Sequence, residues 1–277
     1  MIEALQEYLT KAGKIAIAYS GGVDSTFLLA MSVKVLGAEN VLALTVQSPL
    51  TPPWEVAFAK EFCHARGITL RLLDGSFVLD DERVAANPPQ RCYYCKRKIL
   101  EAMQRAIPDD YALHTGTNAS DETDVRPGMR AEEEMGVRTP LRALRFTKDA
   151  IRAYSQASGV PDFGRPSSPC FATRIPYGEP ITVEKVRMIE KAESFLRQLG
   201  FALVRARLIL PDTACIEVAV DEISRACELH GQISCHLSTI GFRRVTLDLK
   251  GYRMGNFNPE TANAVKMVGK ETKMEVL

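Results

Sequence analysis

A glycine pair between an apolar run and a helical pattern constrains the fold of this chain more than any other feature. Residues 14–19 form the apolar run, Gly21 and Gly22 follow it, and apolar residues at helical spacing extend from Thr26 to Val35. This order predicts a strand, a tight turn and the N-terminus of a helix. The unpaired N–H groups of such a turn, together with the helix dipole, bind phosphate. The two glycines leave no side chain in the way, so the turn is a predicted anion site.

The residues around the glycines exclude two common kinds of phosphate-binding loop. No lysine follows them as a Walker A loop requires, and they do not form G-x-G-x-x-G. Ser20 and Ser25 add hydroxyl donors, and Asp24 is placed to cap the helix or to face a metal ion. A plain strand-to-helix turn is the alternative. Such a turn has no need for the two hydroxyls and the aspartate, so their presence together with the strand and the helix disfavours it.

Strand-like and helical segments alternate through the first half of the chain. The strand-like segments are 14–19, 41–47, 69–73 and 111–115, and the helical ones are 25–37, 53–66 and 93–106. This alternation predicts an α/β fold: a doubly wound parallel sheet with helices on both faces and the ligand beyond the carboxyl ends of the strands. We predict a nucleotide-binding domain at 1–160, a cysteine-bearing active-site loop at 161–181, and a smaller C-terminal α+β domain at 182–277 for substrate binding and oligomerisation.

Composition excludes several classes of partner. The 277 residues carry a net charge of +1, which gives no electrostatic footprint for nucleic acid. No apolar span reaches the roughly 18 residues of a membrane helix, and residues 1–14 resemble an amphipathic helix rather than a signal peptide. We therefore expect a cytoplasmic protein with neither a nucleic-acid nor a membrane partner.

The cysteines fall into two groups. Seven is an odd number, which argues against a disulfide scaffold. Four of them lie in or beside apolar-patterned segments and are predicted to be buried or half-buried; these are Cys63, Cys215, Cys227 and Cys235. The other three are candidates for chemistry.

Cys92 and Cys95 form a C-x-x-C motif between Arg91 and Lys96, and we expect these cations to favour the thiolates. Three interpretations remain open from the residues alone. One is a structural zinc site, which lacks a second C-x-x-C, and another is a redox pair. In the third, Cys170 from the proline-rich loop joins them, and three thiolates hold a [4Fe–4S] cluster with its fourth iron open.

Polar residues at the predicted sheet end are candidates for metal and phosphate. Asp121 or Asp124 could hold Mg²⁺, since carboxylates suit that cation; a solvated loop with Asx turns is the alternative. Arg126 and Arg138 offer guanidinium groups for bidentate phosphate contacts.

Further arginines follow in the second half. Arg205 and Arg207 alternate along a predicted strand, so both side chains face the same way. This pattern suggests an anion on that face, with Arg253 joining them; a solvated sheet face is the alternative.

Taken together, these motifs resemble the LarE family of PP-loop sulfur transferases over nearly the whole chain. The matching segments are residues 20–25, 91–96, 116–121, 126–128, 138–141, 168–178 and 251–255. The first of these identifies only the PP-loop superfamily. The C-x-x-C, the loop around Cys170 and the tail are more specific.

The resemblance implies an activity and its site residues. ATP with Mg²⁺ would adenylate a carboxylate of pyridinium-3,5-biscarboxylic acid mononucleotide, and sulfur would displace AMP to leave a thiocarboxylate, on the way to the nickel-pincer nucleotide of lactate racemase. Asn118 and Arg138 would join residues 20–25 at the nucleotide, with Asp24 and Asp121 as candidate Mg²⁺ ligands. Arg174, Arg205, Arg207 and Arg253 would hold the substrate phosphate.

The resemblance also places Cys170 at the sulfur-transfer step. In one branch of the family this cysteine gives up its own sulfur, and that branch lacks the C-x-x-C. The present chain has all three cysteines and is similar to the cluster-bearing branch, whose members turn over repeatedly. Family members form homo-oligomers, and the donor of sulfide is unknown.

Three other functions compete with this interpretation. A PP-loop tRNA thiolation enzyme would bind tRNA in a salt-sensitive way. An amide-forming ligase of the NAD or GMP synthetase type would not need the three cysteines together. A non-catalytic nucleotide-binding module would bind ATP without releasing pyrophosphate.

Overall fold

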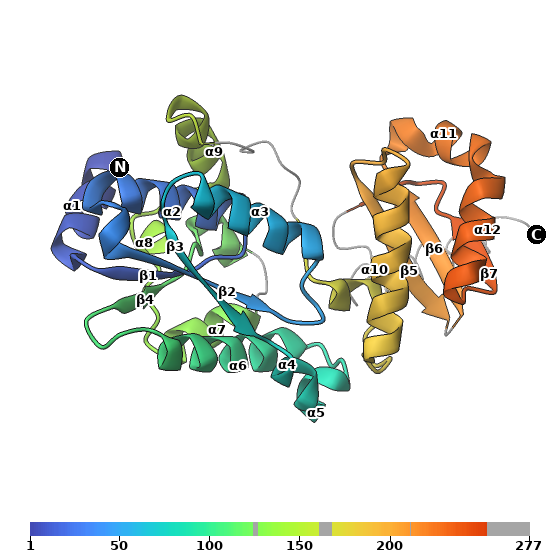
Figure 1. The fold of residues 1–277 in the computed structure, drawn as a ribbon, viewed down its shortest axis with the longest axis horizontal. Helices are drawn as coiled ribbons and strands as arrows, with labels where there is room; N and C mark the ends of the chain where they lie inside the picture. Colours follow the sequence, from blue (N-terminus) through green and yellow to red (C-terminus); the bar gives the residue numbers. More distant parts are fainter. Residues whose placement is uncertain (124–126, 161–167, 211, 254–277) are drawn as a thin grey trace, which may run out of the picture. The chain divides into compact units, whose positions relative to one another are not determined.

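The computed structural model describes residues 1–123, 127–160, 168–210 and 212–253. The chain divides into two compact units, Met1–Cys170 and Phe171–Leu277 (Figure 1). Each unit is described by itself. Of the predicted proline-rich loop, residues 161–167 lie outside the described part of the chain, as do Asp124 and Arg126.

Unit 1 is built on a parallel sheet. In its described residues the strands are β1 (Ile15–Ala18), β2 (Val41–Gln47), β3 (Thr69–Asp74) and β4 (Ala112–His114), in the order β3-β2-β1-β4. Every neighbouring pair is parallel. The predicted α/β sheet is therefore confirmed, with strand bounds within two residues of those expected.

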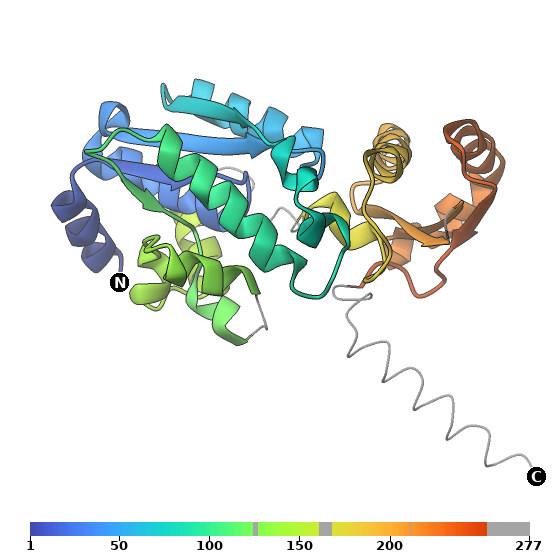
Figure 2. The ribbon, with the colours of Figure 1, turned by 90° about the horizontal axis from the view of Figure 1, so that it is seen from below.

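Helices cover both faces of this sheet, because alternate residues of each strand point to opposite sides. Ile15 and Ile17 of β1 pack in one core with α1 (Ile2–Ala12), α2 (Val23–Leu36), α3 (Pro53–His64) and α9 (Lys148–Ala157). Ala16, between them, belongs to the opposite core with α6 (Arg91–Ala106). Figure 2 shows α6 on one side of the sheet and α3 on the other. Each large apolar side chain buried in these cores contributes about 1.5–3 kcal/mol.

Several short helices are missing from the sequence prediction. They are α4 (Phe77–Asp80), α5 (Glu82–Ala85), α7 (Pro127–Glu134) and α8 (Pro140–Ala143), with the 3-10 turns η1 (Ala38–Asn40) and η2 (Ala119–Thr123). Three of the helices have only four residues, which is too short to show a helical period. The longest, α7, begins with a proline and a glycine, residues that punctuate turns as often as helices.

Unit 2 is a smaller α+β fold, as predicted. Its strands β5 (Val204–Leu210), β6 (Thr213–Val218) and β7 (Arg244–Leu247) pair antiparallel and then parallel in chain order. Its helices are α10 (Val183–Gln198), α11 (Ile223–Glu228) and α12 (His230–Ile240), with 3-10 turns η3 (Phe171–Arg174) and η4 (Val220–Glu222). Thr182 caps α10 by accepting the Lys185 N–H, a contact that stabilises a helix by about 1 kcal/mol.

The prediction for the four non-motif cysteines is half right. Cys63 is buried, and burial raises the pKa of its thiol to about 11, while Cys215 is half-buried. Cys227 and Cys235 are exposed, because they lie on the outward faces of α11 and α12. Within the described residues, no helix is long and apolar enough to cross a bilayer.

Candidate active site

The turn after β1 forms the N-terminus of α2 with Gly22 as its N-cap, so Asp24 lies in the first turn and does not cap the helix. Gly21 has φ +76°, a backbone conformation that side chains disfavour. Ser25 is 4% exposed, and its hydroxyl donates to the Gly22 carbonyl at 3.0 Å and lies 3.1 Å from the Ser20 hydroxyl. The hydroxyls therefore brace the turn, and the N–H groups of the first helical turn are left to an anion.

The order of the strands brings a second loop to this turn. The chain leaves β1 toward β2 and later crosses to β4 on the other side of β1, and α/β folds bind ligands at such a reversal. The loop after β4 begins with Gly116, whose backbone packs on the start of α2. A Cβ there would stand 2.7 Å from the Ser25 nitrogen, so no side chain fits.

Asn118 and Asp121 lie in this second loop, and both are buried, so the interpretation of a solvated loop is wrong. The Asx turn is present, since the Asn118 Oδ1 accepts the Ser120 N–H at 3.0 Å. The Asn118 Nδ2 has no hydrogen-bond partner among the described residues. Asp121 accepts the Asn118 N–H at 3.2 Å and pairs with Lys148 at 3.2 Å. Asn118 thus offers a donor for a ligand, whereas Asp121 holds the loop together.

Arg138 lies beside the end of β4 and is exposed. Its backbone pairs with Leu113 and Thr115, and its guanidinium lies at the Tyr8 hydroxyl, where it opposes the burial that raises the pKa of Tyr8. Tyr8 Oη lies 3.1 Å from His114 Nε2, and His114 Nδ1 lies 2.8 Å from the Ala112 carbonyl. Burial lowers the pKa of His114 to about 4, so this histidine is neutral at pH 7.

The first turn of α3 carries two residues that the sequence analysis missed. Glu55 is 6% exposed, and its Oε2 lies 3.3 Å from where a Cβ on Gly21 would stand. Trp54 donates through Nε1 to the Ser168 hydroxyl at 3.3 Å. One helical turn therefore contacts the phosphate loop and also holds the segment that ends at Cys170. The chain's sole tryptophan, directly after a proline pair that starts a helix, was the available signal.

The C-x-x-C lies in the first turn of α6. Cys92 and Cys95 are three residues apart and so share a helix face. Cys95 is half-buried and Cys92 is exposed. The surrounding protein nevertheless partly desolvates both thiols and raises their pKa, that of Cys95 to about 12, and the nearby charge of Cys170 raises them further. The three sulfurs are therefore near enough to influence one another. Among the described residues, however, no group of three or more cysteine, histidine or acidic side chains is arranged as a formed metal site.

Arg91 and Lys96 favour the Cys95 thiolate, as expected, but their effect is not large enough to make it the preferred form in the metal-free protein. Both cations lower the pKa of Cys95, but burial and the neighbouring sulfurs outweigh them. Arg91 is only 4% exposed and bonds the Asn87 side chain, which is itself buried with φ +57°. This contact fixes the loop that starts α6.

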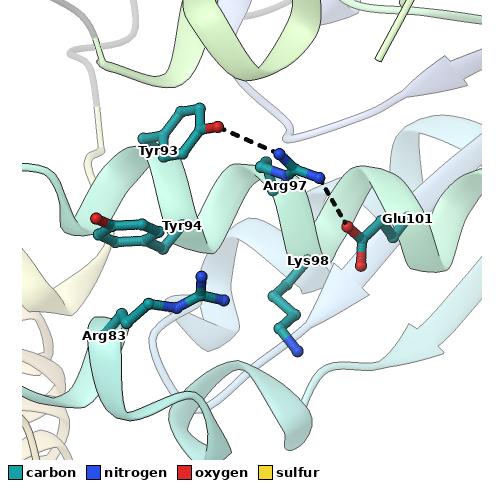
Figure 3. A pocket seen from close by; sticks show the side chains of 6 residues that line it. All are labelled: Arg83, Tyr93, Tyr94, Arg97, Lys98 and Glu101. Carbon is teal, nitrogen blue, oxygen red and sulfur yellow. Dashed lines mark hydrogen bonds and ion pairs between the residues drawn. The ribbon is translucent and has the colours of Figure 1, made fainter. Parts of the chain in front are cut away.

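A pocket of about 370 Å³ lies on the outer side of α6 (Figure 3). Its lining residues are Arg83, Tyr93, Tyr94, Arg97, Lys98 and Glu101. Arg83 stacks on Tyr94 at 4.8 Å, and its bonds to Asp81 lower the pKa of that carboxyl to about 2. Arg97 donates to the Tyr93 hydroxyl and pairs with Glu101. These cations already have partners. Their contacts stabilise the outer face of the helix that carries the C-x-x-C.

The arginines of unit 2 are mostly buried, so a solvated sheet face is wrong for β5. Arg174 is fully buried and bonds both carboxylate oxygens of Glu193 at 2.8 and 2.9 Å. Arg207 bonds Glu217 at 2.8 Å and the Thr173 carbonyl at 2.8 Å.

The other two arginines differ from this pair. Arg205 lies over the Tyr252 ring at 5.0 Å, and burial, with the charge of Arg174, lowers its pKa. Arg253 is exposed. The four arginines are thus gathered in one unit, two of them already held by carboxylates.

Comparison with known proteins agrees with this architecture. A family model described as NAD synthase matches residues 1–76. An uncharacterized protein of Synechocystis is 36% identical over 262 residues, 93% of this chain and 96% of that protein. The pyridinium-3,5-bisthiocarboxylic acid mononucleotide synthase of Lactiplantibacillus plantarum is 33% identical over 260 residues, 91% of each. An uncharacterized protein of Methanocaldococcus jannaschii is 28% identical over 246 residues, 88% of this chain and 92% of that protein.

The parallel sheet, the glycine turn after β1 and the loop after β4 define an enzyme of the PP-loop class, whose members act on ATP. Within this class, the matches over more than nine-tenths of the chain give the family. The chain belongs to the LarE family.

Proposed function

We propose that this protein is an ATP-dependent sulfur transferase that converts a carboxylate of pyridinium-3,5-biscarboxylic acid mononucleotide to a thiocarboxylate, in biosynthesis of the nickel-pincer nucleotide. The L. plantarum relative carries the name of a synthase of the bisthiocarboxylic product. The observation that carries the proposal is the first turn of α3. It lies against the phosphate loop through Glu55 and holds Ser168, two residues before Cys170, through Trp54.

The reaction has two steps. In the first, a substrate carboxylate oxygen attacks the α-phosphorus of ATP, the bond to the bridging oxygen breaks, and pyrophosphate leaves. In the second, sulfur attacks the carbonyl carbon and AMP leaves with the shared oxygen. A carboxylate is a poor electrophile until its oxygen is made into a leaving group, which is what adenylation does.

The residues of unit 1 have distinct roles in the first step. The N–H groups after Gly22, with the hydroxyls of Ser20 and Ser25, would bind phosphate, and the Asn118 Nδ2 would donate to the nucleotide. We assign Mg²⁺ to Asp24, because it lies in the same helical turn. Asp121 stays a candidate ligand, although it also pairs with Lys148. Arg138 is the candidate cation at the edge of β4.

For the substrate phosphate we propose Arg174, Arg205, Arg207 and Arg253. Glu193 and Glu217 would hold two of these guanidinium groups in place, and Arg253 is the exposed member. Guanidinium groups bind phosphate oxygens in pairs with well-defined geometry.

For sulfur delivery we propose a [4Fe–4S] cluster held by Cys92, Cys95 and Cys170. Two thiols on one helix face, with Cys170 near enough to raise the pKa of both, are a donor set that fits such a cluster. When bound, the cluster would carry the sulfur that is transferred. Binding iron also requires the thiolate form, which the metal-free protein disfavours. We therefore expect iron to bind with release of protons.

The ATP step is tested by following pyrophosphate release from the full chain with the substrate. We expect release that depends on the substrate and on Mg²⁺. ATP binding without release under any condition would favour a non-catalytic module, salt-sensitive tRNA binding would favour a tRNA enzyme, and ammonia-dependent amidation by a variant with all three cysteines changed to alanine would favour a ligase.

The cluster is tested by anaerobic purification with iron and sulfide analysis. We expect about four irons per chain, lost in Cys92→Ala, in Cys95→Ala and in Cys170→Ala, and retained in Cys63→Ala and Cys235→Ala as controls. Iron that survives loss of Cys170 would contradict the three-cysteine assignment.

We also propose a cytoplasmic homo-oligomer whose only partners are small molecules. Light scattering of the purified protein tests the assembly, and a monomeric mass at working concentration would contradict it.

A further inference from the structure

Three consecutive glutamates, Glu132, Glu133 and Glu134, end helix α7, and they differ sharply in environment. Glu133 and Glu134 are exposed, whereas Glu132 is 2% exposed. A run of charge on a surface helix normally faces solvent, and a buried carboxylate requires partners. The partners of Glu132 come from two different parts of unit 1.

The first partner is in the loop after β4. The Thr117 hydroxyl lies 3.0 and 2.8 Å from the two carboxylate oxygens of Glu132. Thr117 stands between Gly116, whose backbone packs on Ser25 of the phosphate loop, and Asn118, whose buried Nδ2 lacks a hydrogen-bond partner among the described residues. A ligand in the phosphate loop would therefore meet the residues on both sides of Thr117.

The second partner is on the cysteine-bearing helix. Lys96 directly follows Cys95, and its Nζ lies 2.9 Å from Glu132 Oε1. The start of α7 also packs there: a Cβ on Gly128 would lie 3.8 Å from the Lys96 side chain and 3.9 Å from the Cys92 carbonyl. One buried carboxylate thus joins the first turns of α6 to the loop at the phosphate site.

We propose that Glu132 is a positioning residue that couples nucleotide binding to the geometry of the C-x-x-C. This inference rests on the proposed function, because it takes ATP as the ligand of the phosphate loop. Glu132 is buried, whereas Thr117 and Lys96 are half-buried. A buried carboxylate that loses a partner is costly, so Glu132 follows a shift of Thr117 and passes it to Lys96. Such coupling is reciprocal for binding: a ligand at Cys95 alters ATP affinity by the same factor by which ATP alters the affinity for that ligand.

The test uses the full chain freed of metal, with iodoacetamide as the probe of each thiol and mass spectrometry to locate the label. For the wild type we expect saturating ATP with Mg²⁺ to change the labelling rate of Cys95 by at least about fivefold, the lower end of typical coupling. The rate at Cys235, in unit 2, should not change. Glu132→Gln should still bind ATP but lose the effect on Cys95. Glu133→Gln, one residue along the helix and exposed, should behave as the wild type.

A pair of variants at Thr117 keeps the test independent of the folding of Glu132→Gln. Thr117→Ser retains the hydroxyl and should retain the coupling, whereas Thr117→Val removes it and should abolish the coupling. Persistence of the ATP effect in Thr117→Val or in a folded Glu132→Gln would overturn the proposal, as would a wild type that binds ATP without any change at Cys95. A wild type that binds no ATP would defeat the proposed function itself, and this inference with it.

Discussion

The loop after β1 offers an anion backbone N–H groups and hydroxyls, whereas strand β5 of unit 2 offers guanidinium groups. The first arrangement follows from six consecutive residues and needs no counter-charge, because its donors are uncharged. On β5, Arg207 is already neutralised by Glu217, and Arg174, in the preceding turn η3, is neutralised by Glu193. Counting cations along a strand therefore overstates the charge available to a ligand, whereas a glycine turn at a strand end does not mislead in this way.

The largest expected effect separates a structural arginine from a ligand-binding one. Arg174→Gln leaves Glu193 buried without its partner, and removing one member of a buried pair costs about 3–5 kcal/mol. We expect urea unfolding of unit 2, followed by far-UV circular dichroism, to shift accordingly. Fluorescence of Trp54, which reports on unit 1, should not shift. Equal stability of variant and wild type would show that the Arg174–Glu193 pair does not stabilise unit 2.

The next effect is a pH dependence of the stability of unit 1, which contains a buried, neutral histidine. The pKa of His114 is about 4 in the folded protein and about 6.5 when unfolded. Between these values only the unfolded chain takes up the proton, so stability falls as pH drops from 6.5 toward 4, by about 3 kcal/mol in total. Trp54 fluorescence in urea at several pH values measures this.

The matched controls for that prediction are His114→Gln and His64→Gln, the second at an exposed position. The first should lose most of the dependence between pH 6.5 and 4, and the second should keep it. Parallel curves for wild type and His114→Gln would exclude His114 as the cause.

A third prediction tests the close approach of the two loops in unit 1. Gly116→Ala places a Cβ 2.7 Å from the Ser25 nitrogen, and backbone must move to accept it, at a cost of about 1–3 kcal/mol. We expect weaker ATP binding by calorimetry, by about tenfold or more. Gly231→Ala makes the same chemical change at a position where a Cβ would meet no neighbouring atom within 4 Å, and it should leave ATP binding unaltered. Normal affinity in Gly116→Ala would place the nucleotide elsewhere.

The smallest expected effect concerns an exposed arginine of unit 2. Arg253 is exposed, so Arg253→Gln should leave stability within about 0.5 kcal/mol of the wild type. If its guanidinium binds the substrate phosphate, KM for the mononucleotide should rise about tenfold, which is about 1.4 kcal/mol, with KM for ATP unchanged. An unaltered KM for the mononucleotide would remove Arg253 from the site.

The parts of this molecule that the sequence predicts well are those determined locally. The strand and glycine turn around Gly21 follow from a few consecutive residues, and the alternation of elements predicts the parallel sheet. Helix α7 escaped prediction because a proline and a glycine begin it and because its one buried glutamate looks like its exposed neighbours. Its role depends on Thr117 and Lys96, which are distant in the chain.

The site shows the same division. Cys92 and Cys95 were identified from their spacing, but the rise in their pKa comes from burial and from Cys170, more than seventy residues away. Likewise, nothing in the strand pattern of Arg207 reveals that Glu217, on the neighbouring strand β6, occupies its guanidinium. A single sequence does not reveal which carboxylate pairs with a given arginine in the folded protein, because many carboxylates along the chain are possible partners.

The central claim is that this chain transfers sulfur repeatedly through its three cysteines and does not consume Cys170. The direct measurement is the amount of thiocarboxylate formed per chain under anaerobic conditions with ATP, Mg²⁺, the mononucleotide and excess sulfide, together with the intact mass of the protein afterwards. We expect several products per chain and an unchanged Cys170. At most one product per chain, with the loss of one H₂S from Cys170, would contradict it.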